Sequence, residues 1–124
     1  MKALACEAQF TEGVDVPLAL LSYVEEGVHV IYSPALDLYG YGNDELEARA
    51  GFATTLEEYL SFTAEENSLS ADLSRLGWVV NPQSHSVTMP AWTSLLDKNP
   101  YLNDVMMNRP FKKFDQPTRF PAFA

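Results

Sequence analysis

The pattern of apolar and polar positions predicts two adjacent strands in the first third of the chain. Residues 17–25 (PLALLSYVE) and 28–34 (VHVIYSP) are rich in aliphatic, aromatic and β-branched side chains, with Gly27 in the turn between them. Glycine supplies the positive φ that a tight connection needs, so the pair is expected to form an antiparallel hairpin. A third extended segment over 36–41, closing at the turn Gly40-Tyr41-Gly42, completes a predicted meander, and residues 1–10 are a candidate edge strand.

A long helix is predicted to begin at Asn43, because its side chain can accept hydrogen bonds from the free N–H groups of a first turn. Three carboxylates follow in that turn, where the helix dipole favours negative charge. Small and apolar side chains then recur at spacings of three and four, which predicts the face that packs on the sheet. That face comprises Leu46, Ala50, Ala53, Leu56, Leu60 and Thr63. A shorter helix over 69–76 is expected to end at Gly77, with extended segments at 78–80 and 86–89.

The first two predicted strands are apolar on both faces. In the first strand, Leu18 and Leu20 alternate with Ala19 and Leu21, all of them apolar. One helix can cover only one face of a small sheet, so the second face needs its own cover. The C-terminal residues, a second copy of the chain or a partner protein can supply it, and on this ground we expect a homo-oligomer.

The character of the chain changes at Pro90. Five prolines occur between residues 90 and 121, so long regular elements are not expected there. The same segment carries too many large aromatic side chains for a free disordered tail. We therefore predict an α+β domain over 1–89, with an antiparallel three- to four-stranded sheet and one long helix on one face, followed by a proline- and aromatic-rich tail over 90–124. The tail residues expected to contact a partner are Phe111, Phe114, Phe120, Phe123, Lys112 and Lys113. Packing of the tail within its own domain is the alternative.

The charge of the chain is strongly negative and unevenly distributed. The net charge is −9, and residues 1–80 carry 14 acidic and 3 basic side chains. Because Lys and Arg contacts to phosphates supply most non-specific affinity for nucleic acid, duplex DNA is not an expected partner. A basic protein is better matched to this charge. A function in solubility alone is the competing explanation.

No pattern of catalytic or metal-binding residues is present in the sequence. Cys6, His29 and His85 do not have the spacing of a zinc site, and no G-x-S-x-G motif occurs. The adjacent pairs Glu57-Glu58 and Glu65-Glu66 diverge when they lie on a helix. We therefore expect no enzyme, cofactor or metal. A single cysteine and the lack of an apolar run of roughly 18 to 20 residues favour a reducing cytoplasm and no membrane span.

The stretch from about Leu18 to Leu60 resembles the HicB-like antitoxin family. It includes EEGVHVIYSPALDLYGYGNDELEARAGFATTLEEYL, with a hairpin, an aromatic-x-Pro-x-Leu segment, a glycine-bearing turn, a polar cap and a helix. Its markers are Tyr32, Pro34, Leu36, Gly42 and Leu46.

The resemblance implies a partial ribonuclease-H-like domain, β-β-β-α-β, that lacks nuclease activity. Such a domain oligomerises and binds a small basic toxin that cleaves messenger RNA. Many members carry a C-terminal helix-turn-helix or ribbon-helix-helix module, but the prolines of residues 81–124 fit neither, so no DNA-binding role is expected. The alternative function is a stand-alone RNA- or small-ligand-binding domain with a pocket between sheet and tail.

Overall fold

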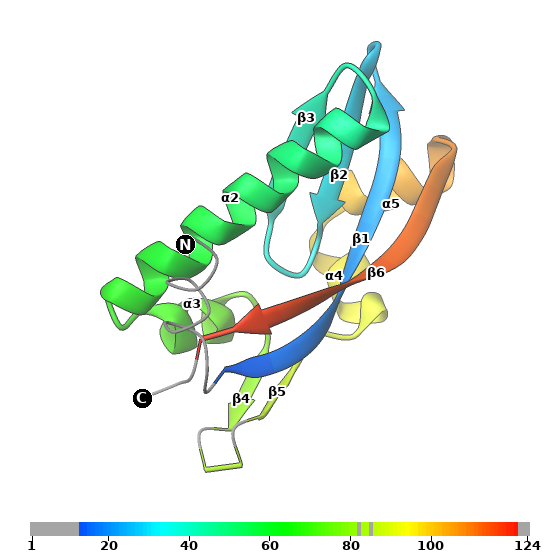
Figure 1. Cartoon of the computed structure of the whole chain (residues 1–124). Helices are drawn as coiled ribbons and strands as arrows, with labels where there is room; N and C mark the ends of the chain where they lie inside the picture. The colour runs from blue at the N-terminus through cyan, green and yellow to red at the C-terminus, as the bar shows by residue number, and fades with distance from the viewer. Residues whose placement is uncertain (1–12, 82, 85, 122–124) are drawn as a thin grey trace, which may run out of the picture.

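The protein has an α+β fold built on a four-stranded antiparallel sheet of order β3-β2-β1-β6 (Figure 1). The computed structural model describes residues 13–81, 83, 84 and 86–121, so the candidate edge strand over 1–10 lies outside the described residues. The strands of this sheet are β1 (Val14–Glu25), β2 (Val28–Ser33), β3 (Leu38–Gly42) and β6 (Phe111–Phe120). Between β1 and β2, Glu26 and Gly27 both have positive φ, 51° and 82°, as a two-residue hairpin turn requires. The predicted fold class and the three-stranded meander are confirmed.

Helix α2 (Glu45–Glu65) packs on β3 and β2. Its N-cap is Asp44 and not the predicted Asn43: the Asp44 carboxylate accepts from the backbone N–H of Glu47, whose own carboxylate accepts from the N–H of Asn43. The arrangement is a variant of the capping box, in which the glutamate accepts from the residue before the N-cap and not from the N-cap itself.

The buried face of α2 is rotated relative to the predicted one. Leu56, Leu60 and Thr63 are buried as expected, but Leu46 is 79% exposed, and Ala48 and Phe52 are buried instead. The buried face is rotated because the backbone of α2 lies close against β3. A Cβ built on Gly40 would lie 2.3 Å from the backbone nitrogen of Phe52, so this glycine, predicted to lie in a turn, is a strand residue under the helix.

The remaining elements before residue 90 are small. Helix α3 (Leu69–Arg75) ends at Gly77, whose φ of +96° fits the predicted stop. The strands expected after it are present as β4 (Val79–Asn81) and β5 (Ser86–Thr88), but they pair with each other in a separate two-stranded sheet. They therefore do not supply the fourth strand of the main sheet.

The expectation that residues 90–124 contain no long regular elements is wrong. They form α4 (Trp92–Lys98), α5 (Pro100–Asn108) and the ten-residue strand β6, which pairs with β1 from Val14↔Phe120 to Tyr23↔Phe111. The prolines occupy tolerated positions. Pro100 is the first residue of α5, where no backbone donor is needed, and Pro117 lies directly opposite Pro17, a pair in which neither residue has an N–H to donate.

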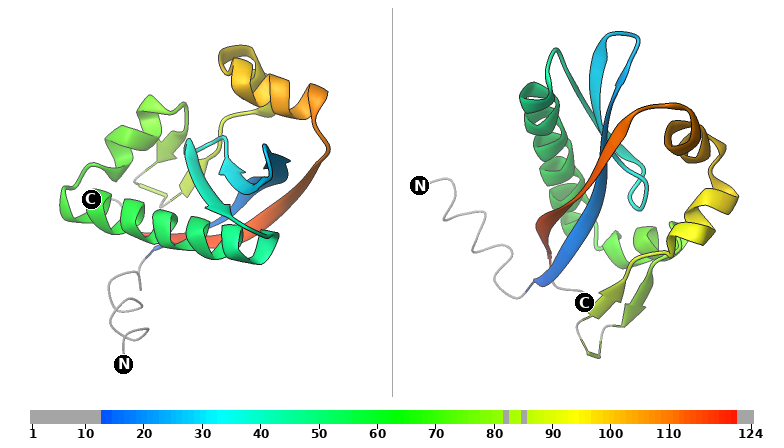
Figure 2. Two further views of the ribbon diagram at one scale, coloured as in Figure 1. Left: turned by 90° about the horizontal axis from the view of Figure 1, so that it is seen from above. Right: turned by 90° about the vertical axis from the view of Figure 1, so that its right-hand side faces the viewer.

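The second face of the sheet is covered by the same chain. Figure 2 shows α2 on one side of the sheet and α4 and α5 on the other. Leu102 and Val105 of α5 are fully buried there against apolar side chains of β1 and β2. The hydroxyl groups of Tyr23 and Tyr101 lie 2.6 Å apart across this contact. Because the tail supplies the cover in cis, an uncovered second face no longer argues for a homo-oligomer.

Across the residues that the structure describes, no helix combines the length and the apolar character that a membrane span requires.

Candidate binding groove

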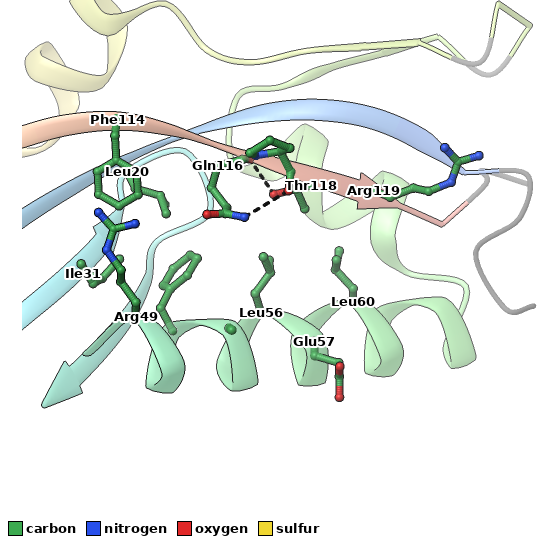
Figure 3. Close-up of a pocket in the computed structure, with 13 residues that line it drawn as sticks. Leu20, Ile31, Arg49, Leu56, Glu57, Leu60, Phe114, Gln116, Thr118 and Arg119 are labelled. Atoms are coloured by element: carbon green, nitrogen blue, oxygen red, sulfur yellow. Dashed lines mark hydrogen bonds between the residues drawn. The ribbon is translucent and has the colours of Figure 1, made fainter. Parts of the chain in front are cut away.

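A groove runs between α2 and β6 on the α2 side of the sheet (Figure 3). Its volume is about 670 Å³, within the range of roughly 300 to 1,000 Å³ that ligand pockets occupy. The apolar lining comes from the sheet (Leu20, Ile31, Phe114) and from α2 (Phe52, Leu56, Leu60). Leu56 and Leu60 point from the helix toward β6, where Gln116 and Thr118 face them. The groove is therefore an apolar channel with a polar rim.

The groove exists because α2 does not lie over the middle of the sheet but over β3 and β2, at one end of the strand order. Gly40 and Gly42 allow the helix backbone to approach β3 closely, since a Cβ on either residue would fall within 2.4 Å of a backbone nitrogen of α2. This contact fixes α2 above β3 and β2. The α2 backbone therefore lies closer to β3 and β2 than to β1 and β6 on this side.

One end of the groove is closed by charged side chains. The Glu45 carboxylate accepts from Lys112 Nζ at 2.6 Å and from Ser22 Oγ at 3.1 Å, and it pairs with Arg49 at 3.0 Å. The Arg49 guanidinium in turn lies 4.0 Å from the centre of the Phe114 ring. These contacts join the first turns of α2 to β1 and β6. The hydrogen bond from Lys112, with further bonds from Ser22 and Arg49, holds the pKa of Glu45 at about 2.

Replacing Glu45 with glutamine is expected to lower the melting temperature near neutral pH, with a difference that shrinks as the pH falls. A lowered folded-state pKa means that the carboxylate stabilises the fold above its unfolded-state pKa of about 4.3. That stabilisation is lost progressively as the pH falls toward about 2. Thermal melts of both proteins between pH 7 and pH 2 measure it.

Glu58→Gln is the control, because Glu58 is exposed on the same helix and forms no ion pair within the described residues. If the difference in melting temperature between wild type and Glu45→Gln stays constant between pH 7 and pH 2, the lost contact is not an ionic one.

The six tail residues predicted to contact a partner do not form one patch. Alternation along β6 places Lys112, Phe114 and Phe120 on the α2 face, and Phe111 and Lys113 on the α5 face. Phe120 has no exposed surface and packs against the Trp78 ring with their centres 5.5 Å apart, so it is a core residue. Of the five that the structure describes, only Phe114 lines the groove.

The same alternation separates the two lysines. Lys113 Nζ lies 5.2 Å from the centre of the Trp92 ring, whereas Lys112 pairs with Glu45. Phe123 lies outside the described residues.

An acidic ridge lies beside the groove. We use this name for Glu57, Glu58, Glu65 and Glu66, which are exposed on and just after the C-terminal half of α2. None of the four forms an ion pair with another described residue. Glu57 also lines the groove, with its carboxylate turned away from β6 (Figure 3). The ridge and the groove are thus two adjacent surfaces of one helix.

Metal chemistry has no support in this part of the molecule. Among the described residues, no group of three or more His, Cys, Asp or Glu side chains is close enough to hold an ion.

Comparison with protein-family models, with curated proteins and with solved structures gives no match to this chain. The resemblance to HicB-like antitoxins therefore rests on its sequence markers.

Proposed function

We propose that this chain is a non-enzymatic, antitoxin-like protein that sequesters a basic, RNA-cleaving partner, and that the acidic ridge is the surface that binds it. The observation that carries the proposal is a concentration of carboxylates without cationic partners at the C-terminal half of α2. The sequence resemblance supplies the class of partner, and the ridge supplies a surface of the matching charge.

The ridge is unfavourable for the isolated fold. Neighbouring carboxylates repel one another, and the C-terminal end of a helix carries a partial negative charge that favours Lys or Arg. The last turn of α2 holds no basic residue, and Glu65 and Glu66 lie there instead. A departure from the locally stabilising choice is typical of a surface that serves function. Cationic side chains of a bound partner would relieve both effects.

The test is capture of partners from the native cell on the immobilised protein, followed by a ribonuclease assay. The ridge variant carries Glu57→Gln, Glu58→Gln, Glu65→Gln and Glu66→Gln. The control variant carries Glu26→Gln, Asp37→Asn, Asp97→Asn and Asp115→Asn, which removes the same charge from exposed acidic residues elsewhere. Wild type and control are expected to retain a basic protein whose RNA cleavage is suppressed in the complex. The ridge variant should associate with it roughly 10-fold or more slowly, because local charge sets the association rate.

The proposal is wrong if no basic protein is retained, or if the retained protein does not cleave RNA after release. Equal association of the partner with the ridge variant and the control would show that the ridge is not the contact surface.

A further inference from the structure

Helix α2 lies mainly over two of the four strands on its face of the sheet. A helix with its side chains is roughly 10 Å across and neighbouring strands are about 4.8 Å apart, so one helix covers about two strands. On the α5 face, the sheet is covered by two helices, α4 and α5. On the other face, α2 packs on β3 and β2. Within the described residues, the β1 side chains on this face are buried, whereas Gln116 of β6 is exposed and Thr118 half-exposed beside α2.

The groove is large enough for an apolar ligand. It is open to solvent, has a volume of about 670 Å³ and is lined by leucine, isoleucine and phenylalanine side chains. The lining of α2 extends from Arg49 to Leu60, a length of about 17 Å at 1.5 Å per residue, which matches three turns of a helix lying alongside.

Charge distinguishes the possible occupants. Glu57 lies at the rim of the groove with its carboxylate on the outer side of α2, so an occupant with a cationic flank can pair with it. An anionic lipid would compete for cations that are already paired: the Arg49 guanidinium is held by Glu45 and by the Phe114 ring, and Arg119, which also lines the groove, pairs with Asp15 at 2.9 Å. A second copy of this chain would bring a net charge of −9 to an acidic surface. Pairing through the edge of β6 is also disfavoured, because Pro117 and the charged side chains of that strand protect the edge.

We infer that the groove between α2 and β6 receives an amphipathic helix of the partner, about three turns long, with apolar side chains at i, i+4 and i+7 in the groove and Lys or Arg toward Glu57. This inference rests on the proposed function and adds the binding mode. The partner helix completes the second layer of the sheet, as helix-in-groove recognition does elsewhere.

The test uses a fluorescein-labelled synthetic peptide of about 14 residues, built of leucine at the helical spacing and lysine elsewhere. A peptide of the same composition with scrambled order is the ligand control. Ala53→Trp is designed to fill the groove, because Ala53 is an exposed helix residue that lines it. Ala50→Trp is the matched protein control, since Ala50 is exposed on the same helix and is not part of the lining. Circular dichroism melts verify that both variants fold.

Fluorescence anisotropy should show that the amphipathic peptide binds wild type and Ala50→Trp with equal affinity, and Ala53→Trp at least about tenfold more weakly. The scrambled peptide should bind none of them. Equal binding to all three proteins overturns the inference. So does displacement of the peptide by a fatty acid that binds more tightly, or a wild-type dimer in light scattering that Ala53→Trp converts to monomer.

The captured basic partner separates this inference from the proposed function. Retention of that partner by Ala53→Trp at wild-type strength leaves the proposed function standing and overturns the groove as its binding site. Absence of any basic partner, with the peptide still bound in the groove, overturns the proposed function alone.

Discussion

Phe120→Ala is expected to lower the free energy of unfolding by about 3–5 kcal/mol, the range measured for large aromatic residues removed from well-packed cores. Phe120 has no exposed surface, packs against Trp78 and pairs with Val14 at the end of β1. Since small domains are stable by only about 5–15 kcal/mol, this one change removes a large part of the total. Urea denaturation followed by tryptophan fluorescence measures it, with Trp78 beside the new cavity.

Phe114→Ala is the control for the Phe120 prediction. Phe114 is only half-buried and lines the groove, so its removal should cost about 1–2 kcal/mol. A Phe120→Ala variant that is as stable as wild type but no longer assembles with another chain would contradict the place of Phe120 in the core. It would make Phe120 a contact between chains.

The elements that were predicted correctly are those whose pattern is local. The hairpin of β1 and β2 follows from two apolar runs and a glycine turn, and α2 follows from a polar cap and a 3.6-residue period. Strand β6 was missed because its partner lies far away in sequence: Phe120 pairs with Val14. The strand FKKFDQPTRF contains a proline, and only the structure reveals that Pro117 faces Pro17, a pair in which neither residue has an N–H to donate.

The groove was predicted only in part. The sequence directed attention to the aromatic residues of the tail, of which Phe114 lines the groove, and to adjacent carboxylates that diverge on α2. What it could not provide is the position of α2 across the sheet. Gly40 and Gly42 were the available indication, because glycines two apart on a strand leave one face open to close approach by a helix. They were interpreted as a turn, and the resulting space over β1 and β6 was not foreseen.

Gly40→Ala is expected to destabilise the protein by about 3 kcal/mol, at the upper end of the usual cost of overpacking. The new Cβ would lie 2.3 Å from the Phe52 nitrogen and 2.6 Å from the Ala48 carbonyl oxygen. Both are backbone atoms of α2, so no side chain can rotate away and the helix must move. Alanine also lowers the conformational entropy of the unfolded chain, but this offsets only about 0.4–1 kcal/mol of the destabilisation. Chemical denaturation gives the difference.

Gly27→Ala is the control that separates close approach from backbone freedom. Gly27 has a φ of +82° and no atom within 4 Å of a built Cβ, so alanine there should cost only the roughly 1–2 kcal/mol of a left-handed conformation. Gly40 is not in that region, so its cost comes from contact with α2 alone. Because that contact also sets the width of the groove, Gly40→Ala should weaken binding of the amphipathic peptide, whereas Gly27→Ala should not. If the two variants bind the peptide with equal affinity, the close contact of α2 with β3 does not set the width of the groove.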